Sequence, residues 1–483
     1  MNKCQNKKVA KRTVSPAVFP QAASCFTVAV VGGGASGIAA ACAIVAGAQE
    51  YARQLRVVVI EKGRKIGSSI LRSGNGRCNF SHINIQPSAF NQPSFVDEVF
   101  KSLEDTFASC GYASPGRADR DLALALCAPA ARYNAVLQWF FELGLVWQEA
   151  PHTEGLLYPF SNRAASVLEV LQAELDRCDV ERVHGVEVTR IERRGDRFSL
   201  QMQDAFDSAR SASFVADAVV FAAGGRACDL LSASGLIRDA AFVPPHPILG
   251  PLRTDTRFLK GLDGIRAHVR LSCSDGVFSE EGEVLFRTYG ISGIVVFNAS
   301  RFVEAGDVVT LDLAPDLSLS NLSEMLIARA HSYGSLTEGA LTYEGLLRGF
   351  FLPELAEMLL RYSDSAAHDL TIAPTREVEE QGIAHIAACI KNFDLVVSGR
   401  GDEKQSQVHR GGLRVDEVDP QTMGVVCAPG FYVTGEALDV DGPCGGFNLH
   451  WAWASGLLAG LSISRSLPSC LDSGAEVGER EER

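Results

Sequence analysis

The sequence predicts an α/β fold, with a parallel-sheet domain that binds a dinucleotide and is split along the chain by an inserted domain. The first observation is a βαβ unit with a glycine motif near the N-terminus. The second is that further strands of the same kind return near the C-terminus. The third is a change of pattern between residues 244 and 405, where short alternating strands and helices appear. The 483 residues are enough for more than one domain, since domains typically hold about 100–200 residues.

The βαβ unit begins with a buried strand at 27–31, because its residues are almost all β-branched or small. The strand ends at the motif Gly32-x-Gly34-x-x-Gly37. These glycines allow a tight turn, close approach of the backbone to a pyrophosphate, and close packing of the next helix. That helix directs free N–H groups at the phosphates. The second strand ends at Glu61, where an acid is expected to bind ribose hydroxyls.

The order of later segments favours FAD over NAD. A simple NAD domain finishes within one block of chain. Here a buried strand at 217–221 leads to Gly224 and Gly225, and a short strand at 431–434 is followed by Gly435 and Glu436. Such a return of strands is typical of a split, glutathione-reductase-like Rossmann-type FAD domain. We therefore expect strand 431–434 to lie in the same sheet as strand 27–31.

Composition favours a cytoplasmic enzyme. The net charge of −13 disfavours a surface coated for nucleic acid, and no run of about 18 apolar residues predicts a membrane span. The 13 cysteines include no CxxC pair, which predicts neither a zinc site nor a disulfide framework. We expect no metal, no membrane and no DNA partner, and the oligomeric state stays open.

The patterns divide the chain into five parts: a flexible N-terminal tail (1–26), the first part of the FAD domain (27–243), an inserted β-barrel plus helical domain (244–405), the second part of the FAD domain (406–465) and a flexible C-terminal tail (466–483). In the first part we expect helices within 94–150, a loop over 158–166 that caps a helix at 167–176, and a meander of strands at 183–192, 197–203 and 213–221. In the insertion we expect strands at 267–273, 282–288 and 307–313, and helices at 322–332, 343–350, 353–360 and 378–390. After the returning strand, a last helix is expected over 451–464.

Several short segments occur together in one order: Ser73-Gly-Asn-Gly-Arg-Cys-Asn79, Gly290-Ile-Ser-Gly293, Gly411-Gly412, 419–423 and 435–449. In combination they resemble the BaiN-like flavoproteins, also described as aminoacetone-oxidase-like FAD-binding enzymes. The resemblance covers about residues 27–464. It implies a split FAD domain, an inserted flattened β-barrel and a small helical domain. The activity that it implies is flavin-mediated reduction of a carbon–carbon double bond, in a bile-acid intermediate or a ribosomal RNA uridine.

The sequence departs from the pattern of these flavoproteins in three places. Ile70-Leu-Arg72 precedes the first segment, where Lys or Thr is usual. The usual segment Val-Thr-x-Gly-Gly-Val is replaced here by Val408-His-Arg-Gly-Gly-Leu413. The usual Asn-Leu-Gln is replaced by Asn448-Leu-His450. We interpret these three differences as a changed rim of the active site, which would imply a changed substrate.

Residue types suggest how the flavin is held. Gly74 and Gly76 let the backbone lie against a flat ring, and Arg77 supplies a cation for phosphate or reduced flavin, unless it forms a structural ion pair. The helix after Gly445 and Gly446 should direct its N–H groups at the flavin edge. The complete set of expected cofactor contacts is Gly32, Gly34, Ala35, Ser36, Gly37, Glu61, Lys62, Ser73, Gly74, Gly76, Arg77, Asn79, Val188, Ala223, Gly224, Gly225, Gly435, Glu436, Gly445, Gly446, Phe447 and Asn448.

Reducing a double bond requires a proton as well as a hydride. We expect Cys444 and Cys78 as candidate acids with Arg77 beside them, and the helix end should lower the pKa of the Cys444 thiol. The alternative for each cysteine is a small apolar side chain of the core. Further candidate donors are His409, Arg410 and His450, which are otherwise ordinary loop residues.

The function these observations favour is an FAD-dependent oxidoreductase that reduces a carbon–carbon double bond of a small-molecule or RNA-borne substrate. No second full glycine motif with its own βαβ unit is present, so NADH or NADPH would reach the flavin transiently as the electron donor. Two alternatives stay open. One is an RNA- or ribosome-associated flavoprotein with a binding or dihydrouridine-forming role, and the other is an amine or aminoketone oxidase.

Overall fold

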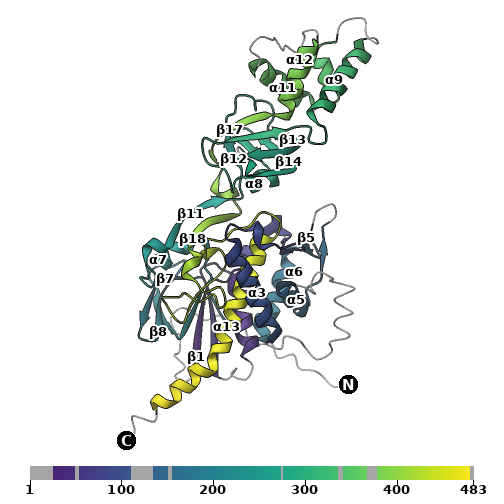
Figure 1. The fold of residues 1–483 in the computed structure, drawn as a ribbon. Coiled ribbons are helices and arrows are strands. Elements are labelled where there is room, and N and C mark those ends of the chain that lie inside the picture. The colour runs from purple at the N-terminus through teal and green to yellow at the C-terminus, as the bar shows by residue number, and fades with distance from the viewer. Residues whose placement is uncertain are drawn as a thin grey trace, which may run out of the picture. The chain divides into compact units, whose positions relative to one another are not determined.

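The computed structural model describes residues 25–48, 54–109, 134–150, 155–273, 276–334, 341–366 and 378–478. The chain forms two compact units, each with its own hydrophobic core (Figure 1). Unit 1 comprises Met1–His246 and His409–Arg483, and unit 2 comprises Pro247–Val408. The expected N-terminal tail lies outside the described residues, except for its last two. Among the described residues, no helix combines the length and the apolar character that crossing a membrane requires.

A five-stranded parallel sheet forms the centre of unit 1, in the order β19-β10-β1-β2-β6. Its strands are β1 (Phe26–Val31), β2 (Leu55–Glu61), β6 (Glu181–His184), β10 (Ala218–Phe221) and β19 (Phe431–Val433). The β-branched residues of the middle strands are buried, as in a sheet that is covered on both faces. The expected return of segment 431–434 to the sheet of strand 27–31 is confirmed, with β10 between the two.

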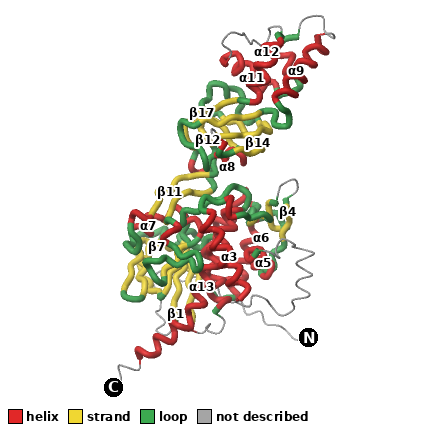
Figure 2. Tube along the Cα trace, in the orientation of Figure 1, coloured by secondary structure: helices red, strands yellow, loops and turns green. Residues whose placement is uncertain are grey.

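Two helices rich in small residues cross closely beside this sheet. They are α1 (Ala35–Gly47) and the long α13 (Phe447–Gly478), the second of which is labelled in Figure 2. A Cβ atom on Gly456 would lie 2.3 Å from the carbonyl oxygen of Ser36, so the two backbones nearly touch. α13 begins before the predicted residue 451 and ends after 464. Residues 466–478, which we expected in a tail, are therefore helical.

The predicted meander is present but divided differently. β7 (Val186–Arg194), β8 (Arg197–Asp204) and β9 (Ser211–Ala216) form a separate antiparallel sheet. The predicted strand 183–192 is wrong as one strand, because Gly185 adopts a positive φ of 72° and separates β6 from β7. The predicted strand 213–221 also divides, at Asp217, whose carboxylate accepts the backbone N–H of Thr27 at 2.7 Å.

The remaining elements of unit 1 are α2 (Ser68–Arg72), β3 (Ser81–His82), α3 (Pro93–Ser109), α5 (Ala135–Glu142), β4 (Trp147–Glu149), β5 (Leu156–Pro159), α6 (Ala164–Arg177) and α7 (Cys228–Ser232). The prediction of helices over 94–150 is wrong for residues 147–149, which form strand β4 and pair with β5. The loop expected over 158–166 begins as strand β5, and α6 starts inside it. No side chain of this loop caps α6, whose N-cap residue is Arg163. Residues 110–133 lie outside the described part.

Unit 2 contains a closed antiparallel barrel in the order β12-β15-β14-β13-β16-β17. Its strands are β12 (Leu252–Thr254), β13 (Arg266–Cys273), β14 (Ser279–Arg287), β15 (Gly290–Ser292), β16 (Val308–Asp312) and β17 (Phe393–Arg400). The sequence patterns missed the barrel strands β12, β15 and β17 and the short helix α8 (Ile294–Ala299). Four further helices are α9 (Leu319–Gly334), α10 (Tyr343–Leu347), α11 (Pro353–Ala366) and α12 (Glu380–Lys391). Where the chain passes between the units, β11 (Phe242–Ile248) pairs with β18 (Val408–Leu413).

Candidate active site

The glycine loop lies at the carboxyl end of β1. Gly32 has a φ of 108°, and a Cβ atom there would lie 2.4 Å from the carbonyl oxygen of Ala222 and 2.9 Å from Ala223 Cα. Gly34 differs, because its backbone is extended and a Cβ atom would meet only Ser69 Oγ, at 3.4 Å. Among the described residues, therefore, the space over Gly34 is open. That space suits a pyrophosphate approaching the backbone and the N-terminus of α1.

Glu61 holds this loop in place. Its Oε2 accepts the N–H of Gly33 at 2.8 Å, and its Oε1 accepts the N–H of Gly63 at 2.6 Å. The carboxylate thus sits at the carboxyl end of β2 beside the glycine loop, and its expected contact with a ribose stays a prediction. Lys62 lies farther out, with 65% of its side chain exposed and an ion pair to Glu187. The side chain of Val188 is buried in β7, next to an irregularity in the pairing with β8.

The segment after α2 has an unusual backbone. Gly74, Asn75 and Gly76 all adopt positive φ angles (54°, 55° and 82°), as does Cys78 (59°). The turn begins at Ser73, whose carbonyl oxygen accepts the N–H of Cys78 at 3.1 Å. The side chain of Arg77 turns outward and lies over the ring of Tyr158, 4.8 Å from its centroid. Positive φ at residues other than glycine is uncommon and clusters at functional sites.

A buried acceptor without a partner lies between this segment and α13. Asn79 is 8% exposed, and its Oδ1 has no hydrogen-bond donor among the described residues. A Cβ atom on Gly446 would lie 2.9 Å from that oxygen and 2.4 Å from the carbonyl oxygen of Ser81, so only glycine fits there. Buried acceptors are almost always satisfied, so we expect a bound ligand to supply the donor. An N–H group of a flavin ring would satisfy it.

The segment that follows β19 packs against α1. Gly435 faces Ser36 of α1, because a Cβ atom there would lie 2.8 Å from Ser36 Oγ. Glu436 accepts the backbone N–H of His409 at 2.7 Å, and its Oε1 lies 3.2 Å from the Nδ1 of that residue. Glu436 also lies near Gly225, where a Cβ atom would be 3.1 Å from its carbonyl oxygen. The expected contact of Glu436 with the ribitol stays a prediction.

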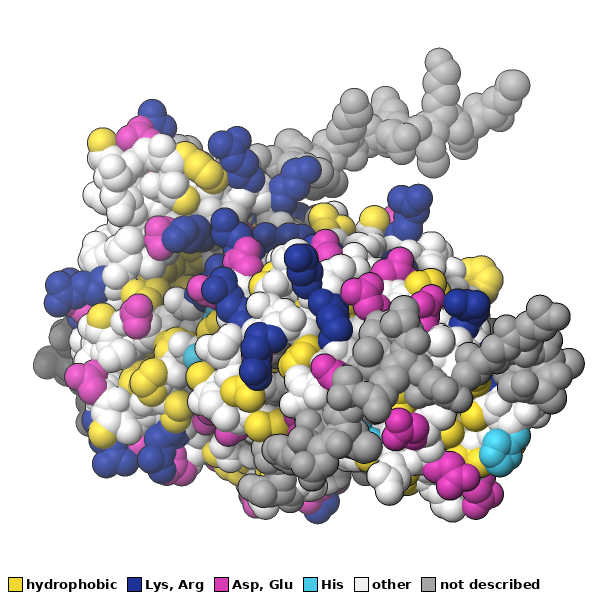
Figure 3. Space-filling view, turned by 90° about the horizontal axis from the view of Figure 1, so that it is seen from above, with side chains coloured by type: hydrophobic (Ala, Val, Ile, Leu, Met, Phe, Trp, Pro, Cys, Tyr) yellow, Lys and Arg dark blue, Asp and Glu magenta, His cyan; other side chains and the backbone are white. Residues whose placement is uncertain are grey.

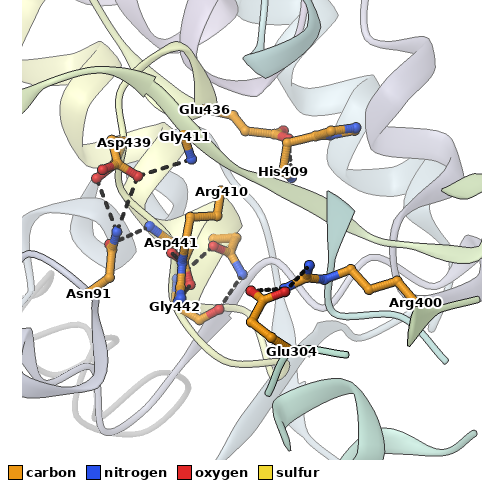
Figure 4. Close-up of polar contacts among 11 residues, drawn as sticks. Asn91, Glu304, Arg400, His409, Arg410, Gly411, Glu436, Asp439, Asp441 and Gly442 are labelled. Atoms are coloured by element: carbon orange, nitrogen blue, oxygen red, sulfur yellow. Dashed lines mark hydrogen bonds and ion pairs between the residues drawn. The ribbon is translucent and has the colours of Figure 1, made fainter. Parts of the chain in front are cut away.

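A polar network that the sequence patterns did not reveal holds the loop that precedes α13 (Figure 4). Arg410 forms a bidentate ion pair with Asp441, at 2.7 and 2.9 Å, and Asp441 is 1% exposed. Asn91 bridges this loop, since its Oδ1 accepts the N–H of Asp441 and its Nδ2 donates to the carbonyl oxygen of Asp439. The Oδ1 of Asp439 accepts the N–H of Gly411. The two aspartates spaced as Asp-x-Asp at 439–441 are the feature of the sequence that could have indicated this network.

The candidate catalytic cysteines lie in different surroundings. Cys78 is fully buried, and burial raises the pKa of its thiol to about 11. Cys444 is half-buried and lies directly before Gly445, with the first turn of α13 following at Phe447. Asn448 braces the same loop, because its Oδ1 accepts the N–H of Gly442 and its Nδ2 donates to the carbonyl oxygen of that residue.

The three alternative proton donors are all engaged. His409 contacts Glu436, and Arg410 is paired with Asp441. His450 is 2% exposed, and burial lowers the pKa of its imidazole to about 3, so it is neutral at neutral pH. In the described part of the chain, no group of three or more His, Cys, Asp or Glu residues is arranged to hold a metal ion.

Comparison with known proteins identifies the family. The model of the HI0933-like protein Rossmann domain matches residues 126–462, and that of an NAD(P)-binding Rossmann-like domain matches residues 30–105. The chain is 30% identical to a 3-dehydro-bile acid delta(4,6)-reductase of Clostridium scindens, over 90% of this chain and 98% of that protein. It is 26% identical to a ribosomal RNA dihydrouridine synthase of Haemophilus influenzae (90% and 98% covered) and 25% identical to one of Escherichia coli (89% and 96% covered).

These matches span both the glycine loop and the segments around Asn79 and Gly446. The resemblance noted from the short segments is confirmed, and so is the fold class of a split Rossmann-type FAD domain with an inserted barrel. The chain belongs to the HI0933-like family and is an FAD-dependent oxidoreductase.

Proposed function

We propose that this protein reduces a carbon–carbon double bond of a small-molecule substrate. The observation that carries the proposal is the 30% identity to the 3-dehydro-bile acid delta(4,6)-reductase, over 90% of the chain. Identity to the two ribosomal RNA dihydrouridine synthases is lower, at 26% and 25%. The proposed substrate class is therefore an unsaturated ring ketone, in which the double bond is conjugated to a carbonyl group. When bound, FAD supplies the hydride chemistry, with NADH or NADPH as the proposed external donor.

Charge supports a small-molecule substrate over RNA. Unit 2 holds 14 Lys and Arg residues against 23 Asp and Glu residues, and RNA binding relies on basic surface. On the face drawn in Figure 3, Lys and Arg side chains are interleaved with Asp and Glu. Many arginines of unit 2 are also neutralised by ion pairs: Arg257–Asp255, Arg266–Glu283, Arg270–Glu281, Arg287–Asp263, Arg348–Glu344 and Arg400–Glu304.

Two side chains of this site suit the proposed reaction. The guanidinium of Arg77 is held over Tyr158, so a cation stands at a fixed place beside the turn at 73–79. Cys444 is half-buried at the start of α13 and carries a dissociable proton. We propose that Cys444 donates the proton that completes the addition across the double bond. Cys78 is fully buried, and we propose that it contributes packing under the turn.

The test is an anaerobic half-reaction experiment on the purified holoprotein. NADH and NADPH are offered first, and bleaching of the flavin absorbance identifies the donor. The reduced protein is then mixed with a 3-oxo-4,6-diene steroid or with a uridine-containing ribosomal RNA fragment. In a separate reaction, the oxidised protein is mixed with an amine in air. Rapid reoxidation by the steroid supports the proposal. Reoxidation by the RNA with formation of dihydrouridine would refute it, and so would hydrogen peroxide release from an amine substrate without reduction of the steroid.

The role of Cys444 has a separate test. We expect Cys444→Ser to keep FAD and its reduction by the donor, while transfer to the acceptor slows, because a hydroxyl is a far weaker acid than a thiol. Cys427→Ser is the matched control, since Cys427 is exposed and donates to the carbonyl oxygen of Leu236. Equal acceptor rates in wild type and Cys444→Ser would remove Cys444 from the reaction.

A further inference from the structure

A buried polar cluster joins three elements beside the candidate site. We call His450, Ser81 and Asn134 the His450 cluster; they belong to α13, β3 and the N-cap of α5. The Nδ1 atom of His450 lies 2.8 Å from Ser81 Oγ, and its Nε2 lies 3.4 Å from Asn134 Nδ2. His450 and Ser81 are 2% and 0% exposed. No role for this cluster follows from the proposed reaction.

The hydrogen bonds of Asn134 determine the tautomer of His450. Asn134 Oδ1 accepts the backbone N–H groups of Val136 (3.0 Å) and Leu137 (3.2 Å), because Asn134 caps α5. Its Nδ2 therefore faces the imidazole and donates to Nε2. The proton of the neutral ring is then on Nδ1, which donates to Ser81 Oγ. His450 thus acts as an acceptor toward α5 and as a donor toward β3.

The same cluster is linked to the unsatisfied acceptor at Asn79. His450 donates its backbone N–H to the carbonyl oxygen of Gly446, at 2.9 Å, in the first turn of α13. The carbonyl oxygen of Ser81 is packed against the Cα of Gly446, and Asn79 lies two residues before Ser81. On the other side, α5 is anchored by Glu104, whose Oε1 accepts the N–H of Ala135 at 2.7 Å. The side chain of His450 therefore connects α13 to Ser81 of β3 and to Asn134 at the start of α5.

We propose that His450 is a positioning residue: its neutral imidazole, donating to Ser81 and accepting from Asn134, holds the carboxamide of Asn79 at the start of α13 and so sets how the flavin edge is bound. The inference depends on FAD binding alone and requires no particular substrate. It predicts that an amide at position 450 can replace the imidazole, because the Gln side chain also offers N–H donors and a carbonyl acceptor. An apolar residue there would leave the Ser81 hydroxyl and the Asn134 amide unpaired.

The test compares His450→Gln and His450→Leu in the full-length holoprotein. Three properties of bound FAD are measured: its dissociation constant, its visible absorption spectrum and its midpoint potential. We expect His450→Gln to match wild type in all three. We expect His450→Leu to weaken FAD by more than about tenfold and to shift the spectrum and the potential, since two buried polar groups lose their partner. The control is Leu200→Ala, a core truncation in β8 that lowers stability without touching this site.

Each result decides the proposal. If His450→Leu binds FAD as tightly as wild type with the same spectrum, the proposal is wrong. It is also wrong if Leu200→Ala changes the flavin to the same extent as His450→Leu, or if His450→Gln is as impaired as His450→Leu. Should His450→Leu not fold, Ser81→Ala replaces it and is expected to shift the flavin spectrum in the holoprotein. An unchanged spectrum in that variant would overturn the inference.

Discussion

At the scale of single residues, Glu61 combines a structural role with an expected role in binding the cofactor. Its two oxygens hold the N–H groups of Gly33 and Gly63, and they lie where the ribose of a dinucleotide is expected. We expect Glu61→Ala to weaken FAD by about 1–3 kcal/mol, because charge-assisted hydrogen bonds are lost. Fluorescence titration with FAD measures the change. Glu192→Ala, which removes only surface ion pairs with Arg190 and Arg194, is the control and should leave the affinity unchanged.

The buried imidazole of His450 also predicts how stability depends on pH. Its pKa in the folded protein is lowered to about 3, chiefly by burial and then by His82, from an ordinary value of 6.5. Between these values the unfolded chain binds a proton that the folded protein does not, so acidification favours unfolding. The contribution is complete above about pH 6.5 and is lost as the pH falls toward 3. We expect the melting temperature of wild type to fall more steeply on acidification than that of His450→Gln. Parallel curves would contradict this.

At the scale of elements, the turn from β1 to α1 contains two glycines with different expected roles. One is required for folding, and the other is required for cofactor binding. Gly32→Ala should prevent folding or strongly destabilise the protein, since φ is 108° and the new Cβ would lie 2.4 Å from the carbonyl oxygen of Ala222. Gly34→Ala should fold, because its backbone is extended and the nearest atom to a Cβ, Ser69 Oγ, is 3.4 Å away. The added methyl would occupy the space for the pyrophosphate, and FAD should be lost. Circular dichroism and flavin content after purification distinguish the two variants. A yellow Gly34→Ala protein with normal affinity would contradict the placement.

A buried ion pair helps to hold the loop between β19 and α13. Arg410→Met would leave the carboxylate of Asp441 buried without its cation, which typically costs about 3–5 kcal/mol. We expect the double variant Arg410→Met/Asp441→Leu to recover much of this loss, because no charge then remains buried. Chemical denaturation of the four proteins of the cycle measures the coupling. Arg414→Met is the control, since Arg414 and Asp416 form an exposed pair. Additive effects of the two substitutions would contradict the coupling.

At the scale of the whole molecule, charge predicts the class of partner. The excess of acidic residues in unit 2 and its many internal ion pairs oppose association with a polyanion. We expect no measurable binding of a ribosomal RNA fragment at physiological salt, and an acceptor reaction that is insensitive to salt. Fluorescence anisotropy with labelled RNA tests the first expectation, and reoxidation rates at several ionic strengths test the second. Micromolar RNA binding that weakens steeply with salt would favour the RNA-borne substrate instead.

The sequence predicted elements well where the residue pattern is strong and local. Four of the five parallel strands of unit 1 (β1, β2, β10 and β19), most helices of unit 2 and three barrel strands were recognisable from the local residue pattern. Predictions failed where neighbouring elements differ only in the sheet that they join. β6 and β7 are separated by Gly185 alone, and β17 follows α12 after a single residue. The period of the hydropathy pattern shows which face of a strand is buried. It does not show which other strand is the neighbour of that strand in a sheet.

By itself, the sequence determined the family, the dinucleotide-binding turn and the segments expected at the site. Each of these depends on short motifs whose residues are close together in the chain. Only the tertiary structure decided which side chains meet. Asn91 pairs with the N–H of Asp441 across 350 positions, and His450 reaches Ser81 across 369. A hydrogen bond requires its two atoms to lie within about 3 Å, and such distances follow from packing of the folded chain. Buried polar groups that the sequence shows as scattered single residues therefore become one site only after folding.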